Sequence, residues 1–128
     1  MQFDYFYGSQ AEQFSFYRIP KVLFTDPQFK PLSTDAKVLY GILLDRMSLS
    51  LKNQWLDAQN KVYIIFTVEE IMDALNCANQ KATRLMVELE KQAGLIERKR
   101  QGLGRPNLIY VKNFAATINN KSCEKGDS

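Results

Sequence analysis

The middle of the chain reads Thr67-Val-Glu-Glu-Ile-Met-Asp-Ala-Leu75 and, after Asn76-Cys-Ala78, continues as Asn79-Gln-Lys-Ala-Thr-Arg-Leu-Met-Val-Glu-Leu-Glu-Lys-Gln92. Apolar residues recur at helical spacing in both segments. Thr67 and Glu70 have the spacing of a capping box, which marks the start of a helix. Asn79 is placed to cap the second helix. The sequence therefore predicts two helices separated by a tight turn.

A hairpin is predicted directly after this helix pair. Gly94 ends the second helix, and two apolar-containing runs at 95–101 and 107–111 flank the turn Gly102-Leu-Gly-Arg-Pro106. The two glycines permit the chain to reverse. Two close helices followed by a two-stranded hairpin with a basic tip are typical of a winged helix-turn-helix, a DNA-binding module.

The excess positive charge of the chain is confined to this region. The 128 residues have a net charge of +3, but residues 79–112 hold 8 Lys and Arg against 3 Asp and Glu. Residues 1–78 hold 7 Lys and Arg against 9 Asp and Glu. A basic surface confined to one part of a chain is the electrostatic footprint of a polyanion partner. We therefore expect the partner to be double-stranded DNA.

Polar donors cluster in the first two turns of the second helix, where recognition helices meet base edges. Arg and Lys can donate to guanine, and Asn and Gln can pair with adenine. The predicted base-contacting residues are Asn79, Gln80, Lys81, Thr83 and Arg84. The predicted phosphate contacts of the hairpin, or wing, are Arg98, Lys99, Arg100 and Arg105. A merely solvated helix face remains the alternative for the helical residues.

The segment before the helix pair completes an α+β domain. Ser33 is a good N-cap for an apolar helix that runs to about Met47, and Gly41 inside it indicates close approach of a neighbouring element. The β-branched and aromatic run 61–66 predicts a strand that joins the hairpin in a three-stranded sheet. Trp55, in the loop between them, is expected to anchor that loop in the core, with a partner contact as the alternative.

The N-terminal region is strongly aromatic and predicts an added β-hairpin over residues 3–18. Aromatic residues fall on both faces of this ribbon, and an isolated hairpin is marginal in water, so the ribbon needs cover. It either packs on its own domain or meets a second protomer. In the second case the predicted homodimer interface contains Phe3, Tyr5, Tyr7, Phe14 and Phe16.

These observations predict three regions and exclude several classes of protein. Residues 1–31 form the aromatic hairpin and connecting arm, 32–114 the winged-helix domain, and 115–128 a polar linker or tail that begins the connection to a longer protein. There is no apolar run of about 18 residues and no signal-peptide pattern. The chain has no histidine, and Cys77 and Cys123 lack metal-ligand spacing. We expect a cytoplasmic protein that is not an enzyme and has no catalytic residues, metal or cofactor.

Four segments of the chain resemble a known family. They are Phe16-Tyr-Arg-Ile-Pro-Lys21, Leu32-Ser-Thr-Asp-Ala-Lys-Val-Leu-Tyr-Gly-Ile-Leu-Leu-Asp-Arg46, Leu49-Ser-Leu-Lys-Asn-Gln-Trp55, and Glu97-Arg-Lys-Arg-Gln-Gly-Leu-Gly-Arg-Pro-Asn-Leu-Ile-Tyr-Val111. Over roughly residues 14–114 the sequence resembles the N-terminal domain of plasmid replication initiator protein A, the RepA_N family.

The resemblance implies a winged-helix domain of a plasmid or mobile-element initiator that binds repeats at a replication origin as a dimer. It also implies that host replication proteins are recruited by a separate C-terminal domain that this sequence does not contain. The residues alone indicate DNA binding, and they leave two alternatives open. One is a winged-helix transcriptional repressor, and the other is a winged-helix module that binds an acidic protein partner.

Overall fold

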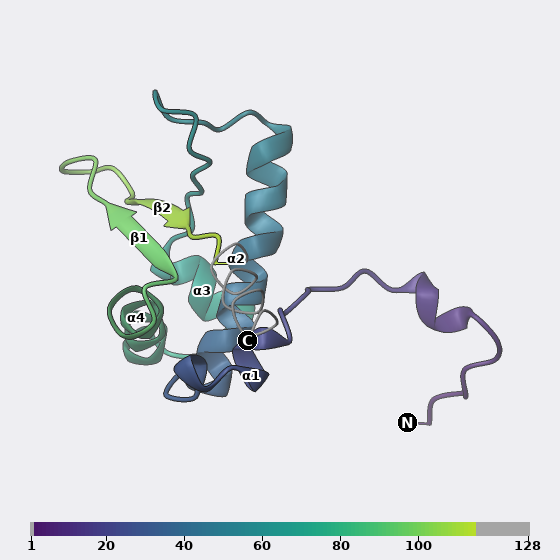
Figure 1. Ribbon diagram of the computed structural model, residues 1–128. Helices are drawn as coiled ribbons and strands as arrows, with labels where there is room; N and C mark the ends of the chain where they lie inside the picture. The colour runs from purple at the N-terminus through teal and green to yellow at the C-terminus, as the bar shows by residue number, and fades with distance from the viewer. Residues whose placement is uncertain (1, 115–128) are drawn as a thin grey trace, which may run out of the picture.

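The long helix α2 (Thr34–Lys52) is the element against which much of the fold packs (Figure 1). The computed structural model describes residues 2–114. Helix α4 (Asn79–Val87), its π-helical extension η3 (Glu88–Gln92) and strand β2 (Leu108–Val111) contact α2. Helix α3 (Val68–Leu75) packs on α4, and strand β1 (Ile96–Lys99) pairs with β2. The predicted α+β class and the order helix, helix, hairpin are confirmed.

Three short elements precede α2. They are the 3-10 helix η1 (Gln10–Gln13), the helix α1 (Val22–Thr25) and the 3-10 helix η2 (Pro27–Phe29). Leu23 and Phe29 are buried in the main core. Residues 22–29 therefore belong with the core, although the sequence placed everything before residue 32 in the arm. The predicted tail 115–128, with Cys123, lies outside the described residues.

Local sequence signals set the helix ends largely as predicted. The Ser33 hydroxyl accepts a hydrogen bond from the Ala36 amide at 3.2 Å. The capping box is complete, because the Glu70 amide donates to Thr67 Oγ1 at 3.2 Å and the Thr67 amide donates to Glu70 Oε1 at 3.1 Å. The expected cap at Asn79 is wrong: Ala78 is the N-cap residue of α4 and provides no side-chain bond.

The hairpin is antiparallel, with Ile96 opposite Val111 and Lys99 opposite Leu108. The predicted third strand at 61–66 is wrong in extent. Within residues 61–66 only Ile64 pairs with the hairpin, through two backbone hydrogen bonds of 2.9 Å to Ile109. Before Ile64 the chain turns back on its own loop instead, with Val62 bridged to Leu56. The sheet therefore has two strands with one added bridge.

The core lies between α2, the α3–α4 pair and the inner face of the hairpin. Its fully buried side chains come from all of these elements and include Leu39, Leu43, Ile71, Leu85, Leu89 and Ile109. Tyr40 closes one edge by donating to the Lys112 carbonyl at 2.9 Å, and burial raises the pKa of Tyr40 to about 12. None of the helices within residues 2–114 has the length and apolar character needed to cross a bilayer.

Trp55 does not anchor its loop in the core. Its side chain is 39% exposed and stacks on Tyr63, with ring centroids 6.2 Å apart and planes at 18°. The loop is fixed instead by Asp57, which accepts the Tyr110 hydroxyl at 3.0 Å. Asp57 also accepts the amide of Lys61, the largest of the interactions that hold the pKa of Asp57 below its usual value.

The predicted N-terminal β-hairpin is wrong. Within residues 2–18 the structure has no strand; the segment is extended around η1 and projects from the body of the domain (Figure 1). A turn forms locally because the Tyr7 amide donates to the Gln10 side chain. The five predicted interface side chains, which are between 50% and 85% exposed, are Phe3, Tyr5, Tyr7, Phe14 and Phe16. The alternative that this ribbon packs on its own domain is therefore also wrong.

The root of the arm packs against α2 at Gly41. The close approach of a neighbouring element that the sequence predicted at this glycine is confirmed. A Cβ at position 41 would lie 2.8 Å from Ile19 Cγ1 and 3.0 Å from the carbonyl oxygen of Arg18. The backbone of Arg18 cannot rotate away as a side chain can. Gly41 therefore fixes where the arm leaves the domain.

Replacing Gly41 by alanine tests this contact, because two effects of opposite sign compete. At a helix position with room for a methyl group, replacing glycine by alanine stabilises the folded protein by roughly 0.5–1 kcal/mol. Overpacking against the Arg18 backbone destabilises by about 1–3 kcal/mol. We expect Gly41→Ala to lower Tm in thermal unfolding, whereas the control Leu51→Ala, at an exposed position of the same helix away from the arm root, changes it little. A Tm above that of the native chain would contradict the close packing.

Candidate nucleic-acid interface

Helix α4 presents one apolar and one polar face. Ala82, Leu85 and Met86 are buried against the core, as helical spacing requires. The short turn after α3 is possible because Asn76 adopts a left-handed backbone with φ of 51°, which Asn tolerates better than most residues. The exposed residues of the opposite face include four of the five predicted base contacts: Asn79, Gln80, Thr83 and Arg84.

Lys81, the fifth predicted base contact, lies differently. Its ammonium is 2.6 Å from a carboxylate oxygen of Asp35, in the first turn of α2. Both side chains are about half exposed, so this ion pair adds little stability but directs Lys81 toward α2. The structure does not group Lys81 with Gln80 and Arg84.

Arg98 is also paired inside the fold. Its guanidinium donates to Glu90 Oε1 through Nη2 at 2.7 Å and through Nε at 3.2 Å. Both side chains are largely buried, and the Arg98 hydrogen bond is the main cause that lowers the pKa of Glu90. Arg98 therefore joins β1 to η3, and its charge is already paired with Glu90.

The other three predicted wing cations lie at the tip of the hairpin and point into solvent. Lys99, Arg100 and Arg105 are exposed, and no ion pair holds them within residues 2–114. Gly102 and Gly104 have φ of 120° and 79°, and Gln101 closes the loop by donating to the Pro106 carbonyl at 2.8 Å. Leu103 stands fully exposed at the end of this loop.

Glu88 fixes the end of α4 to the start of α2. This buried carboxylate accepts the Ser33 amide at 2.9 Å and the Ser33 hydroxyl at 3.0 Å. The chain reaches this position through the π-helical turn η3, in which the Ala93 amide donates to the Glu88 carbonyl. The sequence predicted an unbroken helix to residue 92, so this turn is a correction.

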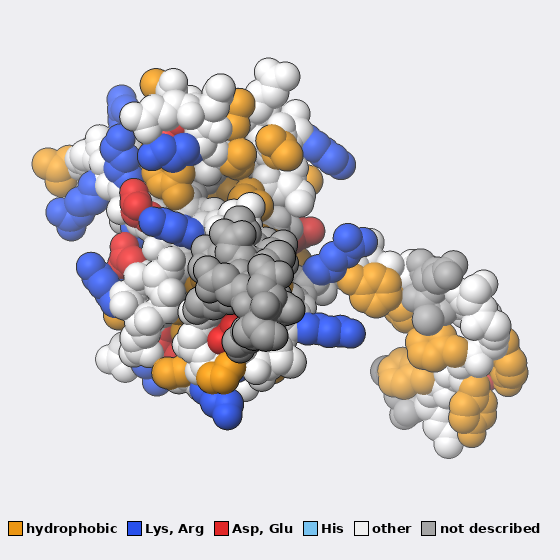
Figure 2. Space-filling view, in the orientation of Figure 1, with side chains coloured by type: hydrophobic (Ala, Val, Ile, Leu, Met, Phe, Trp, Pro, Cys, Tyr) orange, Lys and Arg blue, Asp and Glu red, His pale blue; other side chains and the backbone are white. Residues whose placement is uncertain are grey.

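Pairing of the acidic residues leaves a cationic surface. All three acidic residues of 79–112 are engaged: Glu88 with Ser33, Glu90 with Arg98, and Glu97 with Lys112 at 3.3 Å. Five exposed cations remain without an ion pair in the described part of this segment: Arg84, Lys91, Lys99, Arg100 and Arg105. Helix α4 and the hairpin lie on the same side of the domain, and Lys and Arg side chains project around the hairpin tip (Figures 1 and 2).

The fold and this surface define a class of protein, namely a small α+β domain with a helix pair, a protruding hairpin and a cationic face. The protein-family model of the replication initiator protein A (RepA) N-terminus matches residues 15–125 of the sequence. The chain therefore belongs to the replication initiator protein A N-terminal family, as its sequence motifs indicated.

Individual relatives agree with this assignment. A 41 kDa protein of Lactobacillus helveticus is 32% identical over 103 residues, which is 80% of this chain but 28% of the relative. The chain thus spans little more than a quarter of that protein's length. Among solved structures, the N-terminal domain of a DNA-binding protein has 37% identity and a TM-score of 0.72, covering 99% of this chain and 98% of that one.

Two further solved structures are similar over almost their whole length. A structure of a Rep–DNA complex has 37% identity and a TM-score of 0.72, covering 98% of both chains. A structure of an MDR initiator has 39% identity and a TM-score of 0.71, covering 98% of this chain and 99% of that chain.

The Glu90–Arg98 pair gives a prediction for pH dependence. Because the pKa of Glu90 is lower in the folded chain than its ordinary value of 4.5, its contribution to stability is present above that value and is lost as pH falls through the folded pKa. Glu90→Gln is therefore expected to lower Tm at neutral pH, with the difference from the native chain shrinking at an acid pH below 4.5. Asp73→Asn, at an exposed position of α3, is the control. An equal Tm difference at both pH values would refute the assignment.

Proposed function

We propose that this chain is the part of a replication initiator that binds double-stranded DNA at origin repeats of a plasmid or mobile element. The observation that carries the proposal is the pairing of every acidic residue in 79–112, which leaves five exposed cations on α4, η3 and the hairpin. Family membership supports the replication role, and similarity to a Rep–DNA complex supports DNA as the ligand.

The order of elements supports a winged helix-turn-helix. The elements follow one another in the order of that fold: helix α2, the bridged segment at Ile64, helices α3 and α4, and the β1–β2 hairpin. In this assignment α4 is the recognition helix and the hairpin is the wing. The wing then lies along the phosphate backbone when α4 occupies the major groove.

The contacts divide into two groups by chemistry. Base edges are read by Asn79, Gln80, Thr83 and Arg84, whose donors and acceptors can match guanine or adenine in the major groove. Phosphates are bound by Lys91, Lys99, Arg100 and Arg105. Lys81 and Arg98 serve to orient α4 and β1, because their charges are already paired with Asp35 and Glu90.

The protein acts as a homodimer joined by its aromatic arms. Exposed aromatic side chains in this number are rare on a monomer and mark an interaction surface. A dimer sets two α4 helices about one DNA turn apart, roughly 34 Å, or a multiple of it. Catalysis is not part of this role, and host replication proteins are recruited in the cytoplasm by a C-terminal region of the longer initiator.

Footprinting of the protein on the DNA of its own genetic element tests the proposal. We expect protection of several iterated sites at a replication origin. A single protected promoter palindrome would instead identify a transcriptional repressor. Absence of duplex binding near physiological salt, together with binding of an acidic protein, would identify a protein-interaction module.

Arg100→Ala tests the phosphate role of the wing. Four phosphate contacts for each protomer make eight for the proposed dimer, which gives a slope of log affinity against log salt of roughly −7.2, and Arg100→Ala removes one contact from each protomer and reduces its magnitude by about 1.8. We expect affinity to fall alike for all sequences, as measured by fluorescence anisotropy across a salt series. Leu103→Ala removes an uncharged side chain from the same tip and must leave the slope unchanged. A loss confined to one DNA sequence would contradict the role of Arg100.

A further inference from the structure

The aromatic arm, residues 2–17, leaves its rings at least half exposed, although Phe16 and Tyr17 at its root border pockets beside α2. Its side chains contact one another: Phe6 and Phe14 have ring centroids 5.9 Å apart, and Phe14 and Phe16 6.2 Å apart. Hydrophobic side chains line the visible surface of the projecting arm (Figure 2). This segment therefore carries apolar surface that a partner has to cover.

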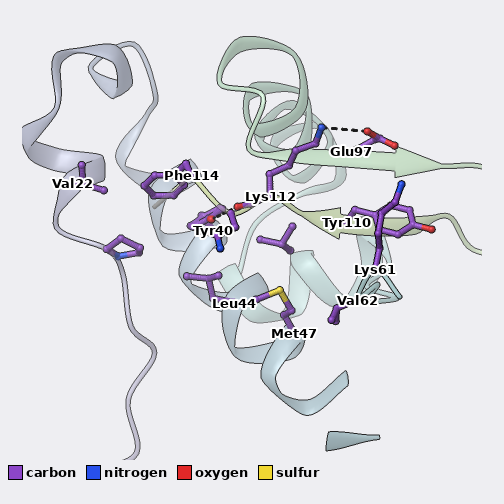
Figure 3. Close-up of a pocket in the computed structure, with 13 residues that line it drawn as sticks. Val22, Tyr40, Leu44, Met47, Lys61, Val62, Glu97, Tyr110, Lys112 and Phe114 are labelled. Carbon is purple, nitrogen blue, oxygen red and sulfur yellow. Dashed lines mark hydrogen bonds and ion pairs between the residues drawn. The ribbon is translucent and has the colours of Figure 1, made fainter. Parts of the chain in front are cut away.

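An apolar groove opens on the domain at the place where the arm begins. It has a volume of about 880 Å³, and it lies between α2, the segment before α1 and the outer edge of the hairpin (Figure 3). Its floor and walls are apolar and include Val22, Leu44, Met47, Val62 and Phe114. Pockets of roughly 300–1,000 Å³ accept drug-sized ligands, so the groove has room for several aromatic rings.

We propose that this groove receives the aromatic arm of a second copy of the chain, so that two protomers exchange arms. The proposal rests on the homodimer proposed above and names where its interface lies. In this arrangement the rings of the arm do not pair mainly with the partner's arm. They enter the partner's groove, beside Leu44, Met47 and Val62.

The course of the arm favours a second copy over self-docking. Tyr40 and Met47 face the groove from one stripe of α2, and Leu44 borders both this stripe and the next. The arm root instead runs beside Gly41 and Ser48, on the adjoining stripe about 100° round the helix. To reach its own groove the chain would have to reverse at its anchored root, whereas a partner's arm can enter directly.

Area and charge both fit the exchange. A fully covered aromatic side chain buries roughly 150–250 Å², so four from each arm give about 1,200–2,000 Å² for two arms, the size of a stable interface. Residues 2–17 carry Asp4 and Glu12 and no Lys or Arg. The groove rim has Lys61, which makes no ion pair within residues 2–114, and the Lys112–Glu97 pair. An acidic arm thus meets a rim of net positive charge.

The exchange also closes on itself. Pro20 and Val22 belong to the groove, and they follow the arm directly in sequence. Each arm therefore starts beside the groove that its partner fills, so one two-fold axis satisfies both exchanges. A closed pair of identical contacts gives a dimer and not an open filament.

The test uses two full-length variants with complementary defects. The arm variant combines Phe3→Ser, Tyr5→Ser, Tyr7→Ser and Phe14→Ser, which leaves the groove intact. The groove variant is Met47→Arg, with Val62→Lys as a second version in case one of them fails to fold. The control is Leu51→Arg, one turn further along α2, exposed and outside the groove. Circular dichroism checks folding, and native mass spectrometry and analytical ultracentrifugation report assembly.

We expect the native chain and Leu51→Arg to have twice the 14.8 kDa chain mass. Each groove variant should raise the dimer Kd roughly 30-fold or more, as loss of an interface hot spot does. The arm variant alone should also be monomeric. A mixture of the arm and groove variants should form a heterodimer, because one intact arm still meets one intact groove.

Three results would overturn the exchange. They are a monomeric native chain, folded groove variants that dimerise as tightly as Leu51→Arg, and a mixture without heterodimer at the highest concentration at which both variants stay in solution. Duplex binding by the native chain is measured in parallel. A dimer that does not bind DNA would refute the proposed function and leave the exchange standing, whereas DNA binding without a heterodimer would refute only the exchange.

Discussion

The hydrogen bonds between Glu88 and Ser33 are the interaction on which the arrangement of the cationic face depends. Glu88 lies at the end of α4, and its carboxylate accepts hydrogen bonds from Ser33 at the beginning of α2. The helix dipole and the Ser33 amide both favour a carboxylate at this position. A buried carboxylate that lost these partners would be strongly unfavourable, so the end of α4 is held at one position. Two residues later, Glu90 holds Arg98 of β1. One short π-helical turn thus fixes α4 to α2 on one side and to the hairpin on the other.

This clamp explains how a chain of modest net charge can present a cationic surface. The acidic residues of 79–112 are not absent, but each is turned to a partner inside or beside the fold. Cations without such partners remain on the helix face and at the hairpin tip. A π-helical turn is rare and often found at functional sites, and here Glu88 at its first position is buried while Lys91 is exposed.

The sequence was informative where structure depends on neighbouring residues. The capping box at Thr67, the N-cap at Ser33 and the apolar spacing of α4 act over three or four positions, and the structure has them as predicted. Even Gly41 was readable, because a glycine inside an apolar helix usually indicates a close neighbour. The exposed positions of Gln80, Thr83 and Arg84 follow from the same periodicity.

Where the sequence misled, the deciding partner was distant or outside the chain. The sequence did not show that Lys81 and Arg98 are ion-paired, because formal charge does not reveal a partner such as Asp35, 46 positions away. Trp55 stacks on a neighbouring tyrosine and not on the core. The aromatic arm had the composition of a strand, but a strand requires hydrogen bonds to a neighbouring strand, and the sheet within residues 2–114 pairs only β1 with β2. The aromatic residues of the arm therefore indicate that it needs to be buried, and they do not predict its secondary structure. The arm leaves the domain beside Gly41 and projects away from α4 (Figure 1), so the proposed dimer surface and the proposed DNA surface are separate.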